Sequence, residues 1–339
     1  MTRIEASPLP LRLARPFRIA HGVSTERINL LVRIGPGTGE AGLPPYLGID
    51  VQAASEWIRS VELPDAPVNR PPPVESWLAE LPEGPPAAVA AIDLALHDWW
   101  AQEIGQPLYV LLGLDPSRSQ PSYQTLAIPE SPDTLSEADL PHGSRIKLKL
   151  GLGHVAADLA LVRRIRELTD ATLCVDANGA WSIPDAVRAI PQLKELGVAF
   201  VEQPIAGRDP EDWHLLRRLL TGGGLPPLIA DESVRTEDDV VALAGAADGI
   251  NVKLAKCGGI ARSKRLIGLA RALDMQVVLG CMVESSLAIT AAAHLASLAD
   301  HVDLDGATLL ADDPFVGAVL QDGMPVLPDG PGLGVRPRP

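Results

Sequence analysis

The sequence predicts an α/β fold in which a (β/α) barrel carries a smaller α+β domain. Eight short apolar runs after residue 120 alternate with amphipathic segments, as parallel strands and helices do in a barrel. Ionisable residues stand at the ends of several of these runs. The chain of 339 residues is long enough for both domains, and its 46% hydrophobic content is sufficient for a buried core.

The composition argues against several classes of protein. The net charge is −14 and no run of Lys and Arg forms a basic patch, which disfavours nucleic acid and anionic membranes as partners. No stretch approaches the roughly 20 apolar residues of a membrane helix, and the first residues lack the apolar core of a secretory signal, so we expect a cytoplasmic protein. Cys174, Cys257 and Cys281 are far apart, and we expect small buried residues rather than a disulfide or a zinc site.

Residues 1–115 are predicted to form the α+β domain. The first 45 residues alternate apolar and polar positions around turn signals, which is typical of antiparallel strands. The segments 51–63 and 85–113 carry apolar residues at helical spacing. We therefore expect a small helical layer packed on a sheet.

Residues 116–314 are predicted to form the barrel. Between the first two strand candidates, the segment 131–144 contains Pro and Gly and is too short for a full helix, so we expect a degenerate first helix. Residues 315–339 are typical of two short strands around a turn and are expected to return to the first domain. The eight strand candidates are 123–128, 145–150, 172–177, 198–203, 227–232, 249–254, 276–281 and 301–306.

Two lysines on the second strand candidate share one face of the strand. Lys147 and Lys149 are two residues apart, so both ammonium groups reach the barrel mouth if this face is the interior. The alternative is a pair of solvated lysines on an edge strand. Lys253 ends the sixth strand candidate, across the ring from Lys149. A lysine on each side of a substrate carbon can remove a proton from one face and return one to the other.

Three acidic residues end three successive strand candidates: Asp176, Glu202 and Asp231. About one βα unit separates each from the next. For each acid alone, a helix N-cap or a polar strand end is the alternative. Three carboxylates that converge repel each other without a cation, and an all-oxygen site with open positions suits Mg²⁺. The three acids together therefore predict a divalent ion.

A further acidic pair lies on the eighth strand candidate. Asp303 and Asp305 share a face by the same period-two spacing. Two carboxylates at the mouth can hold an ammonium group of a substrate. The alternative is a polar strand end that caps the following loop.

These motifs resemble the enolase superfamily, its muconate-lactonizing subgroup and, within that subgroup, the dipeptide epimerases. The shared motifs are KLKLG, VDANGAW, VEQP, ADES, NVKLAKCGG and GCMVES, in the family's order over nearly the whole chain. The resemblance implies a modified TIM barrel, (β/α)7β, with an α+β capping domain whose loops close over it. It also implies Lys149 and Lys253 as the acid/base residues, and one Mg²⁺ per subunit on Asp176, Glu202 and Asp231.

The resemblance further implies a two-base 1,1-proton transfer through an enediolate, which inverts the α-carbon of the C-terminal residue of a dipeptide. Asp303 and Asp305 would bind the free ammonium of the dipeptide, and Lys147, Cys281 and Met282 are further candidates for substrate contact. The alternatives on the same scaffold are an N-acylamino acid racemase, an o-succinylbenzoate synthase and a cycloisomerase, which have no use for the acidic pair. A more distant alternative is a non-catalytic barrel that acts as a binding module.

The side-chain specificity departs from the best-known pattern of the family, in which an arginine on a capping loop meets the glutamate of Ala-Glu. The corresponding loops are 20–27 and 39–50. The second has no basic residue and offers Tyr46 and Leu47, while the first offers His21 and, further along, Arg27. We expect a preference for apolar or uncharged dipeptides over Ala-Glu. The expected partner is a small dipeptide, and the sequence leaves the oligomeric state and the metabolic pathway open.

Overall fold

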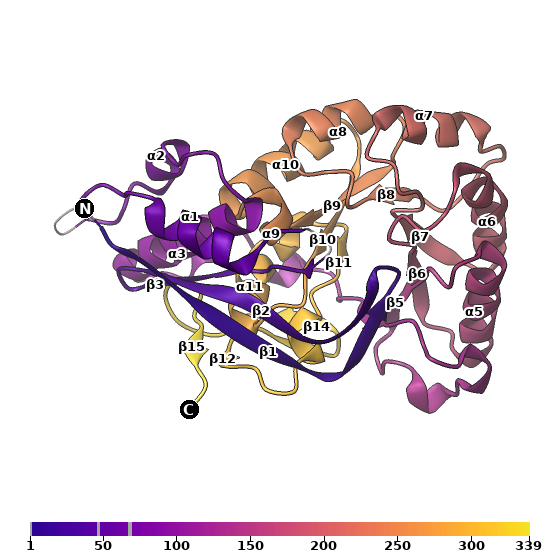
Figure 1. Ribbon diagram of the computed structural model, residues 1–339, viewed down its shortest axis with the longest axis horizontal. Helices are drawn as coiled ribbons and strands as arrows, with labels where there is room; N and C mark the ends of the chain where they lie inside the picture. The colour runs from indigo at the N-terminus through magenta and orange to yellow at the C-terminus, as the bar shows by residue number, and fades with distance from the viewer. Residues whose placement is uncertain (1, 46–47, 67–69) are drawn as a thin grey trace.

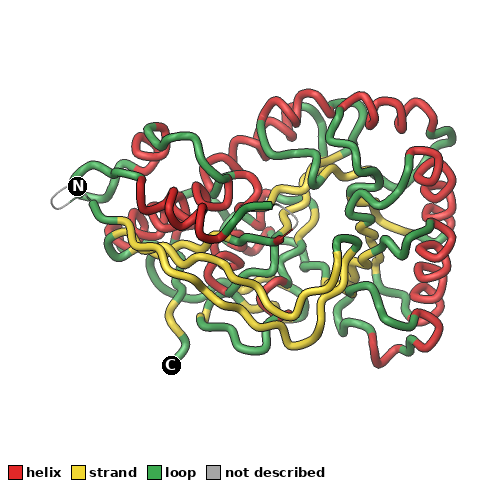
Figure 2. The backbone as a smooth tube through the Cα atoms, in the orientation of Figure 1, coloured by secondary structure: helices red, strands yellow, loops and turns green. Residues whose placement is uncertain are grey.

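The structure is a computed structural model that describes residues 2–45, 48–66 and 70–339. It consists of a small sheet covered by helices and a ring of strands enclosed by further helices (Figures 1 and 2). The predicted α/β class, with a barrel and a capping domain, is confirmed. Within the described ranges, none of the helices combines the length and the apolar character that crossing a membrane requires.

A three-stranded antiparallel sheet forms the base of the capping domain. Its strands are β1 (Ile4–Ile19), β2 (Gly22–Ile34) and β3 (Gly37–Ala41). Buried and exposed positions alternate along much of β1, as in a sheet with one covered face. The pairing of β1 with β2 shifts register between Arg12 and Phe17, and beyond this point the hairpin reaches across to the barrel (Figure 1).

Helices cover this sheet, and the longest of them packs unusually close to it. A Cβ added at Gly39 would lie 2.0 Å from the carbonyl oxygen of Ala91, so the absence of a side chain on β3 sets the packing distance. Gly105, with φ of 74°, ends this longest helix in a left-handed turn. The helices are α1 (Val51–Ser60), α2 (Val74–Ala79), α3 (Pro86–Ile104) and α4 (Leu108–Leu111).

Eight parallel strands form the barrel in the order of the sequence. The ring closes where Ser122 bridges to Val302 and the N–H of Tyr123 donates to the carbonyl of Val302 at 2.8 Å. All eight strand candidates are confirmed, each somewhat shorter than predicted. The strands are β4 (Gln124–Leu126), β5 (Arg145–Lys149), β6 (Thr172–Asp176), β7 (Val198–Glu202), β8 (Leu228–Ala230), β9 (Gly249–Lys253), β10 (Gln276–Gly280) and β11 (His301–Val302).

Helices enclose the barrel on the outside (Figure 1). The first connection contains only the short 3-10 turns Pro132–Thr134 and Glu137–Asp139, so the predicted degenerate first helix is confirmed. The helices of the later connections are α5 (Val155–Leu168), α6 (Ile183–Glu195), α7 (Pro210–Leu219), α8 (Glu237–Leu243), α9 (Leu254–Cys257), α10 (Ile260–Ala272) and α11 (Ser286–Ala293).

An apolar layer fills the barrel beneath its mouth. Tyr123 and Phe200 meet edge to face, with ring centroids 5.5 Å apart. Cys174, Phe200 and Ile229 each precede an acidic residue by two positions, so they face the same interior one layer lower. The polar mouth of the barrel therefore rests on a buried apolar layer.

The final residues of the chain run back toward the capping domain. Phe315–Val316 (β12) pairs with Arg336–Pro337 (β15), and Val319–Gln321 (β13) pairs with Met324–Val326 (β14). The N–H of Leu108 donates to the carbonyl of Gly332 at 2.9 Å, and the N–H of Leu333 donates to Asp98 on α3 at 2.9 Å. The C-terminal segment thus contacts α3 and α4.

A buried polar seam joins the capping sheet to the barrel. The Glu40 carboxylate, on β3, accepts hydrogen bonds from Asn29 Nδ2 at 2.7 Å, from the N–H of Ser285 at 3.1 Å, and from the Ser285 hydroxyl. Asn29 Nδ2 also donates to the carbonyl of Val283 at 3.2 Å. The capping domain therefore holds the segment that follows β10 at the barrel mouth.

We predict that replacing Gly39 by Ala destabilises the capping domain. The added methyl group would collide with the backbone of α3, and overpacking of this kind costs about 1–3 kcal/mol. Gly268→Ala is the matched control, because no atom lies near that position in α10, where the change should stabilise the helix by up to about 1 kcal/mol. Urea denaturation measures both, and equal stabilities for the two variants would contradict the prediction.

We predict that Glu284, beside the seam, makes stability fall with rising pH. Burial raises the pKa of Glu284 to about 8, and the nearby Glu40 carboxylate adds to this effect. The folded protein keeps this proton up to about pH 8, whereas the unfolded chain loses it above its ordinary pKa of 4.5. The free energy of unfolding should therefore fall between pH 5 and pH 8, by up to about 1.4 kcal/mol per pH unit.

The Glu284→Gln variant should show a flatter dependence over the same pH window, since it has no proton to lose. Thermal and urea unfolding at several pH values measure the difference. Glu137→Gln, at an exposed position, is the control and should keep the slope of the parent protein. A slope in E284Q as steep as that of the parent protein would count against a buried proton at Glu284.

Candidate active site

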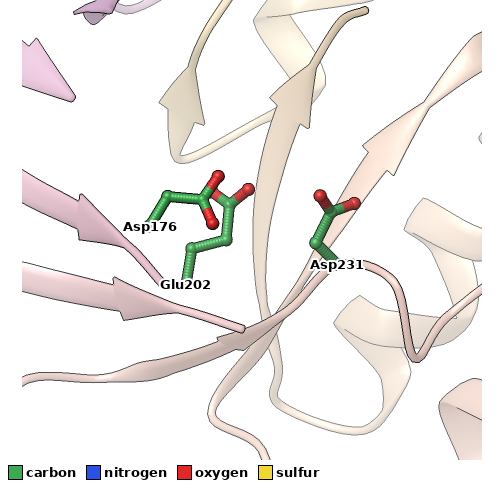
Figure 3. Close-up of side chains that lie close together, drawn as sticks. All are labelled: Asp176, Glu202 and Asp231. Atoms are coloured by element: carbon green, nitrogen blue, oxygen red, sulfur yellow. The ribbon is translucent and has the colours of Figure 1, made fainter. Parts of the chain in front are cut away.

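Three carboxylates meet at the mouth of the barrel. Asp176 ends β6, Glu202 ends β7, and Asp231 directly follows β8. Each is at most 2% exposed, and the three offer oxygen atoms that all lie within 4.8 Å of one another. Figure 3 shows the side chains reaching into one space from adjacent strand ends. Parallel strands bring their carboxyl ends to the same rim, which explains the convergence.

Two lysines flank this carboxylate cluster from opposite sides. Lys149 Nζ, on β5, lies 2.6 Å from Asp176 Oδ2, and Lys253 Nζ, on β9, lies 2.6 Å from Asp231 Oδ2. Strands β6, β7 and β8 lie between β5 and β9 in the ring. The two ammonium groups therefore lie at opposite ends of the carboxylate cluster.

A third lysine lies beneath the mouth and contacts three carboxylates. Lys147 Nζ lies 2.8 Å from Glu202 Oε1, 2.8 Å from Asp303 Oδ2 and 3.2 Å from Asp176 Oδ2. Burial opposes its charge, but these carboxylates outweigh burial and hold the pKa of Lys147 well above its ordinary value. Lys147 is thus a fixed cation, not a solvated lysine on an edge strand.

The pKa values of the three carboxyl groups shift in different directions, according to which lysines lie near each group. Burial raises the pKa of Asp176, but Lys149 and Lys147 more than compensate and hold it far below its usual range. Lys253 and Lys256 likewise outweigh burial and lower the pKa of Asp231. For Glu202, burial and the Asp176 charge raise the pKa to about 8. Glu202 Oε2 has no hydrogen-bond partner within the described part of the chain.

The acidic pair predicted on the last strand lies beside this cluster, although not for the predicted reason. β11 ends at Val302, and Asp305 begins a 3-10 helix, so strand alternation does not align the two side chains. The Asp305 carboxylate accepts hydrogen bonds from the N–H of Thr125 at 2.5 Å and from its hydroxyl at 3.2 Å. Burial and the Asp303 charge raise the pKa of Asp305 to about 7. Asp303 Oδ1 is buried and, among the described residues, has no partner.

One cavity connects these groups to the capping domain. Its ionisable lining residues from the barrel are Lys147, Lys149, Lys253, Asp303 and Asp305. The remaining wall residues come from both domains and include the predicted Cys281 and Met282. These walls are Phe17, Ile19, Arg27, Pro44, Thr125, Asn178, Cys281, Met282, Val283, Gly306 and Leu309.

The specificity residues predicted from the capping loops differ in their position relative to the cavity. His21 lies in the turn at the tip of the β1–β2 hairpin and is not one of the described residues that line the cavity. Tyr46 and Leu47 lie outside the described residues. Arg27, which the sequence offered further along the first capping loop, is 6% exposed and lines the cavity wall.

The burial pattern on β2 agrees with the position of Arg27 at the cavity. Arg27 and Asn29 are buried, while Ile28 between them is 46% exposed. In a two-sided strand, polar residues on both sides of an exposed apolar residue indicate a face turned toward a polar site.

Other polar residues of the site were not predicted. Lys256 Nζ, in the turn after Lys253, contacts Asp231 Oδ1 at 2.6 Å and the carbonyl of Asn251 at 2.8 Å. Asn251 Nδ2 donates to Glu202 Oε1 at 2.9 Å. Asn251 is two residues before Lys253 on β9, so the period-two spacing used for Lys147 and Lys149 would have indicated it. Cys174 and Cys257 are buried as expected, whereas Cys281 is only half-buried.

Known proteins resemble the chain over most of its length. A family model described as enolase C-terminal domain-like matches residues 142–339. The L-Ala-D/L-Glu epimerase of Bacteroides thetaiotaomicron is 35% identical over 97% of this chain and 86% of its own. The hydrophobic dipeptide epimerase of Roseobacter litoralis is 40% identical over 74% of this chain and 73% of its own.

A solved structure extends the likeness to the whole fold. The dipeptide epimerase from Cytophaga hutchinsonii, complexed with Mg and D-Ala-L-Val, matches with a TM-score of 0.90 at 28% identity, over 100% of this chain and 96% of that chain. The sequence relatives and this structure are named as epimerases, which are isomerases of amino acid derivatives. The chain therefore belongs to the enolase superfamily and, within it, to the family of dipeptide epimerases.

Proposed function

We propose that this isomerase is a Mg²⁺-dependent dipeptide epimerase that inverts the α-carbon of the C-terminal residue of an L-Xaa-Xaa dipeptide. The observation that carries the proposal is the pair Lys149 and Lys253 on opposite sides of the Asp176, Glu202 and Asp231 cluster. A single base returns a proton to the face from which it was taken. Two bases on opposite faces allow inversion.

The cluster suits one Mg²⁺ per subunit. Its donors are all carboxylate oxygens, they converge within 4.8 Å, and Glu202 Oε2 is buried without another described partner. The Cytophaga structure and a dipeptide epimerase from Enterococcus faecalis were both solved with Mg and a dipeptide. A bound ion would stabilise the negative charge that develops on the substrate carboxylate when the α-proton leaves.

The lysines carry the proton transfer. We propose that one of Lys149 and Lys253, as the neutral amine, takes the α-proton as a general base, which leaves an enediolate. The other lysine, as the ammonium, then gives its proton to the opposite face. Both side chains are at least nine-tenths buried, at 8% and 4% exposed, so bulk water has little access to the reacting face. Lys147 contacts Glu202 and Lys256 contacts Asp231, so positive charge adjoins two members of the buried cluster.

Asp303 supports a dipeptide rather than an N-acyl amino acid. Its Oδ1 is a buried acceptor in the cavity wall, and a substrate ammonium group satisfies it, whereas an acyl group does not. For this reason we favour a dipeptide epimerase over an N-acylamino acid racemase, an o-succinylbenzoate synthase and a cycloisomerase.

The partner in this proposal is a free dipeptide in the cytoplasm. We also propose the domain division at residues 115/116 and 314/315.

The direct test of the reaction is isotope exchange in D₂O. With Mg²⁺ present, the enzyme should add one mass unit to susceptible members of a dipeptide library. Lys149→Ala should lower exchange from one epimer by about 10²–10⁴-fold while keeping exchange from the other, and Lys253→Ala should show the opposite preference. Lys194→Ala, at an exposed position on α6, is the control. Equal losses from both epimers in each variant would sink the two-base assignment.

We further propose a preference for apolar or uncharged side chains. Phe17, Ile19 and Pro44 from the capping domain, with Met282, Val283 and Leu309 from the barrel, give the cavity largely apolar walls. Arg27 is the cation that the described part of the capping domain adds to this wall, and its Nη1 donates to the carbonyl of Glu26 at 3.1 Å. The related Roseobacter enzyme is named for hydrophobic dipeptides.

Steady-state kinetics test the preference. The enzyme should have a kcat/KM for L-Ala-L-Leu at least about tenfold above that for L-Ala-L-Glu, a difference of about 1.4 kcal/mol in transition-state binding. Arg27→Met should be measured in parallel. If the parent enzyme prefers Ala-Glu and R27M loses this preference, Arg27 selects an acidic side chain and the proposed specificity is wrong.

A further inference from the structure

A carboxylate outside the site is buried against two loops of the barrel mouth. Asp158, in the first turns of α5, is 1% exposed. Its Oδ1 accepts hydrogen bonds from the N–H groups of Gly151 and Leu152, both at 2.9 Å, and its Oδ2 accepts one from Trp181 Nε1 at 2.8 Å. Burying a carboxylate is costly unless donors replace its water, and these three neutral donors do so.

The three donors belong to the two loops that follow the strands of Lys149 and Asp176. Gly151 and Leu152 come one residue after the strand that ends in Lys149. Trp181 follows Asp176, the acceptor of the Lys149 ammonium group, in the loop before α6. At the strand ends, the N–H of Leu150 also donates to the carbonyl of Asp176 at 2.8 Å. One side chain on α5 thus holds both partners of the Lys149–Asp176 contact from outside the barrel.

The turn that Asp158 holds has little freedom to shift. Gly151 has φ of 112°, a conformation that residues with a side chain rarely adopt. A Cβ added there would lie 2.6 Å from Cβ of Ala20, at the tip of the capping hairpin, and 3.4 Å from Cβ of Ala180. The capping domain therefore rests directly on the turn that follows Lys149.

Helix capping does not account for this carboxylate. His154 is the N-cap of α5, and its Nδ1 accepts the N–H of Ala157 at 3.1 Å. Asp158 lies four residues further on, and its side chain turns back to the loops instead of satisfying the helix end. A neutral residue would serve packing alone without the cost of a buried charge.

We propose that Asp158 is a positioning residue for the proton transfer, which fixes Lys149 against the substrate carbon by holding the turn after β5 and the loop after β6. The inference rests on the proposed function. Because Lys253 stands on the opposite side of the ring, loss of Asp158 affects the two faces of the substrate unequally. A purely structural role would lower both faces together, through the fraction of folded enzyme.

The test is Asp158→Asn in the full-length enzyme with saturating Mg²⁺. The asparagine amide has nearly the shape of the carboxylate, but its NH₂ group cannot accept a hydrogen bond. It must therefore face either the Trp181 indole N–H or the N–H groups of Gly151 and Leu152, and those hydrogen bonds are lost. Solvent-deuterium exchange is measured separately from the two epimers of one dipeptide. The epimer whose exchange depends on Lys149 is identified as the one that loses exchange in Lys149→Ala. We expect D158N to lower exchange from this epimer about tenfold more than from the other, since small displacements of a reacting group reduce rates steeply.

Two further variants keep the test decisive. Trp181→Phe removes a single donor and should shift the ratio between faces in the same direction by a smaller factor, which decides the matter if D158N does not fold. Asp98→Asn is the matched control, because Asp98 is also buried, at 4% exposed, and accepts hydrogen bonds from the N–H groups of Thr38 and Leu333, in segments that carry neither lysine.

D98N should leave the ratio between faces within about twofold of the parent enzyme, a margin of about 0.4 kcal/mol. A ratio in both D158N and W181F that matches the parent enzyme would overturn the role of Asp158, whatever the total activity. Absence of exchange in the parent enzyme with every dipeptide would instead refute the proposed function, so the two failures are distinguishable.

Discussion

The structure depends above all on the neutralisation of buried carboxylates at the barrel mouth. Each negative charge taken out of water costs several kcal/mol unless opposite charge or hydrogen bonds compensate for it. The barrel supplies ammonium groups on both sides of the cluster and beneath it. The same lysines that can move a proton therefore also allow the acidic rim to exist. The carboxylates are Asp176, Glu202, Asp231 and Asp303, and the lysines are Lys147, Lys149, Lys253 and Lys256.

The geometry of the strands makes this arrangement rigid. Asp176, Glu202 and Asp231 each stand two residues above an apolar side chain of the barrel floor. Two residues are the repeat of a strand, so the reacting layer and the packed layer face the same interior at a fixed separation. Lys149, Lys253 and most of the carboxylate cluster thus project from close-packed strands, and Asp231 stands in the first position after its strand.

The features that could be predicted from the sequence are those that depend on the two-residue repeat of strands and on where strands end. The eight barrel strands, the short first connection, the convergence of the three acids and the position of Lys147 all follow from local spacing. Asp305 shows the limit of this reasoning, because it reaches the cavity from a 3-10 turn beyond β11 rather than by alternation. Arg27 was one of two candidates of the first capping loop, and the sequence could not choose between them, because the path of the hairpin determines which residue reaches the cavity.

Contacts between distant segments were beyond prediction from one sequence. Glu40 and Ser285 are 245 residues apart, and neither position carries a local signal that it meets the other. Asp158 lies in an ordinary amphipathic helix, where an acid in the first turns is common and has no evident partner. Such contacts arise only when the whole chain has folded, although they hold the walls and the loops of the site.

The seam at Glu40 has a consequence for how members of this family can diverge. Among the described residues, those of the capping domain that line the cavity lie within residues 17–44, whereas the lysines and the carboxylate cluster belong to the barrel. Asn29 and Glu40, which attach the capping sheet to the barrel, lie in that same short stretch. An exchange of this stretch between relatives would carry its own attachment with it, so recognition can be recombined as a module while the proton-transfer machinery is inherited unchanged.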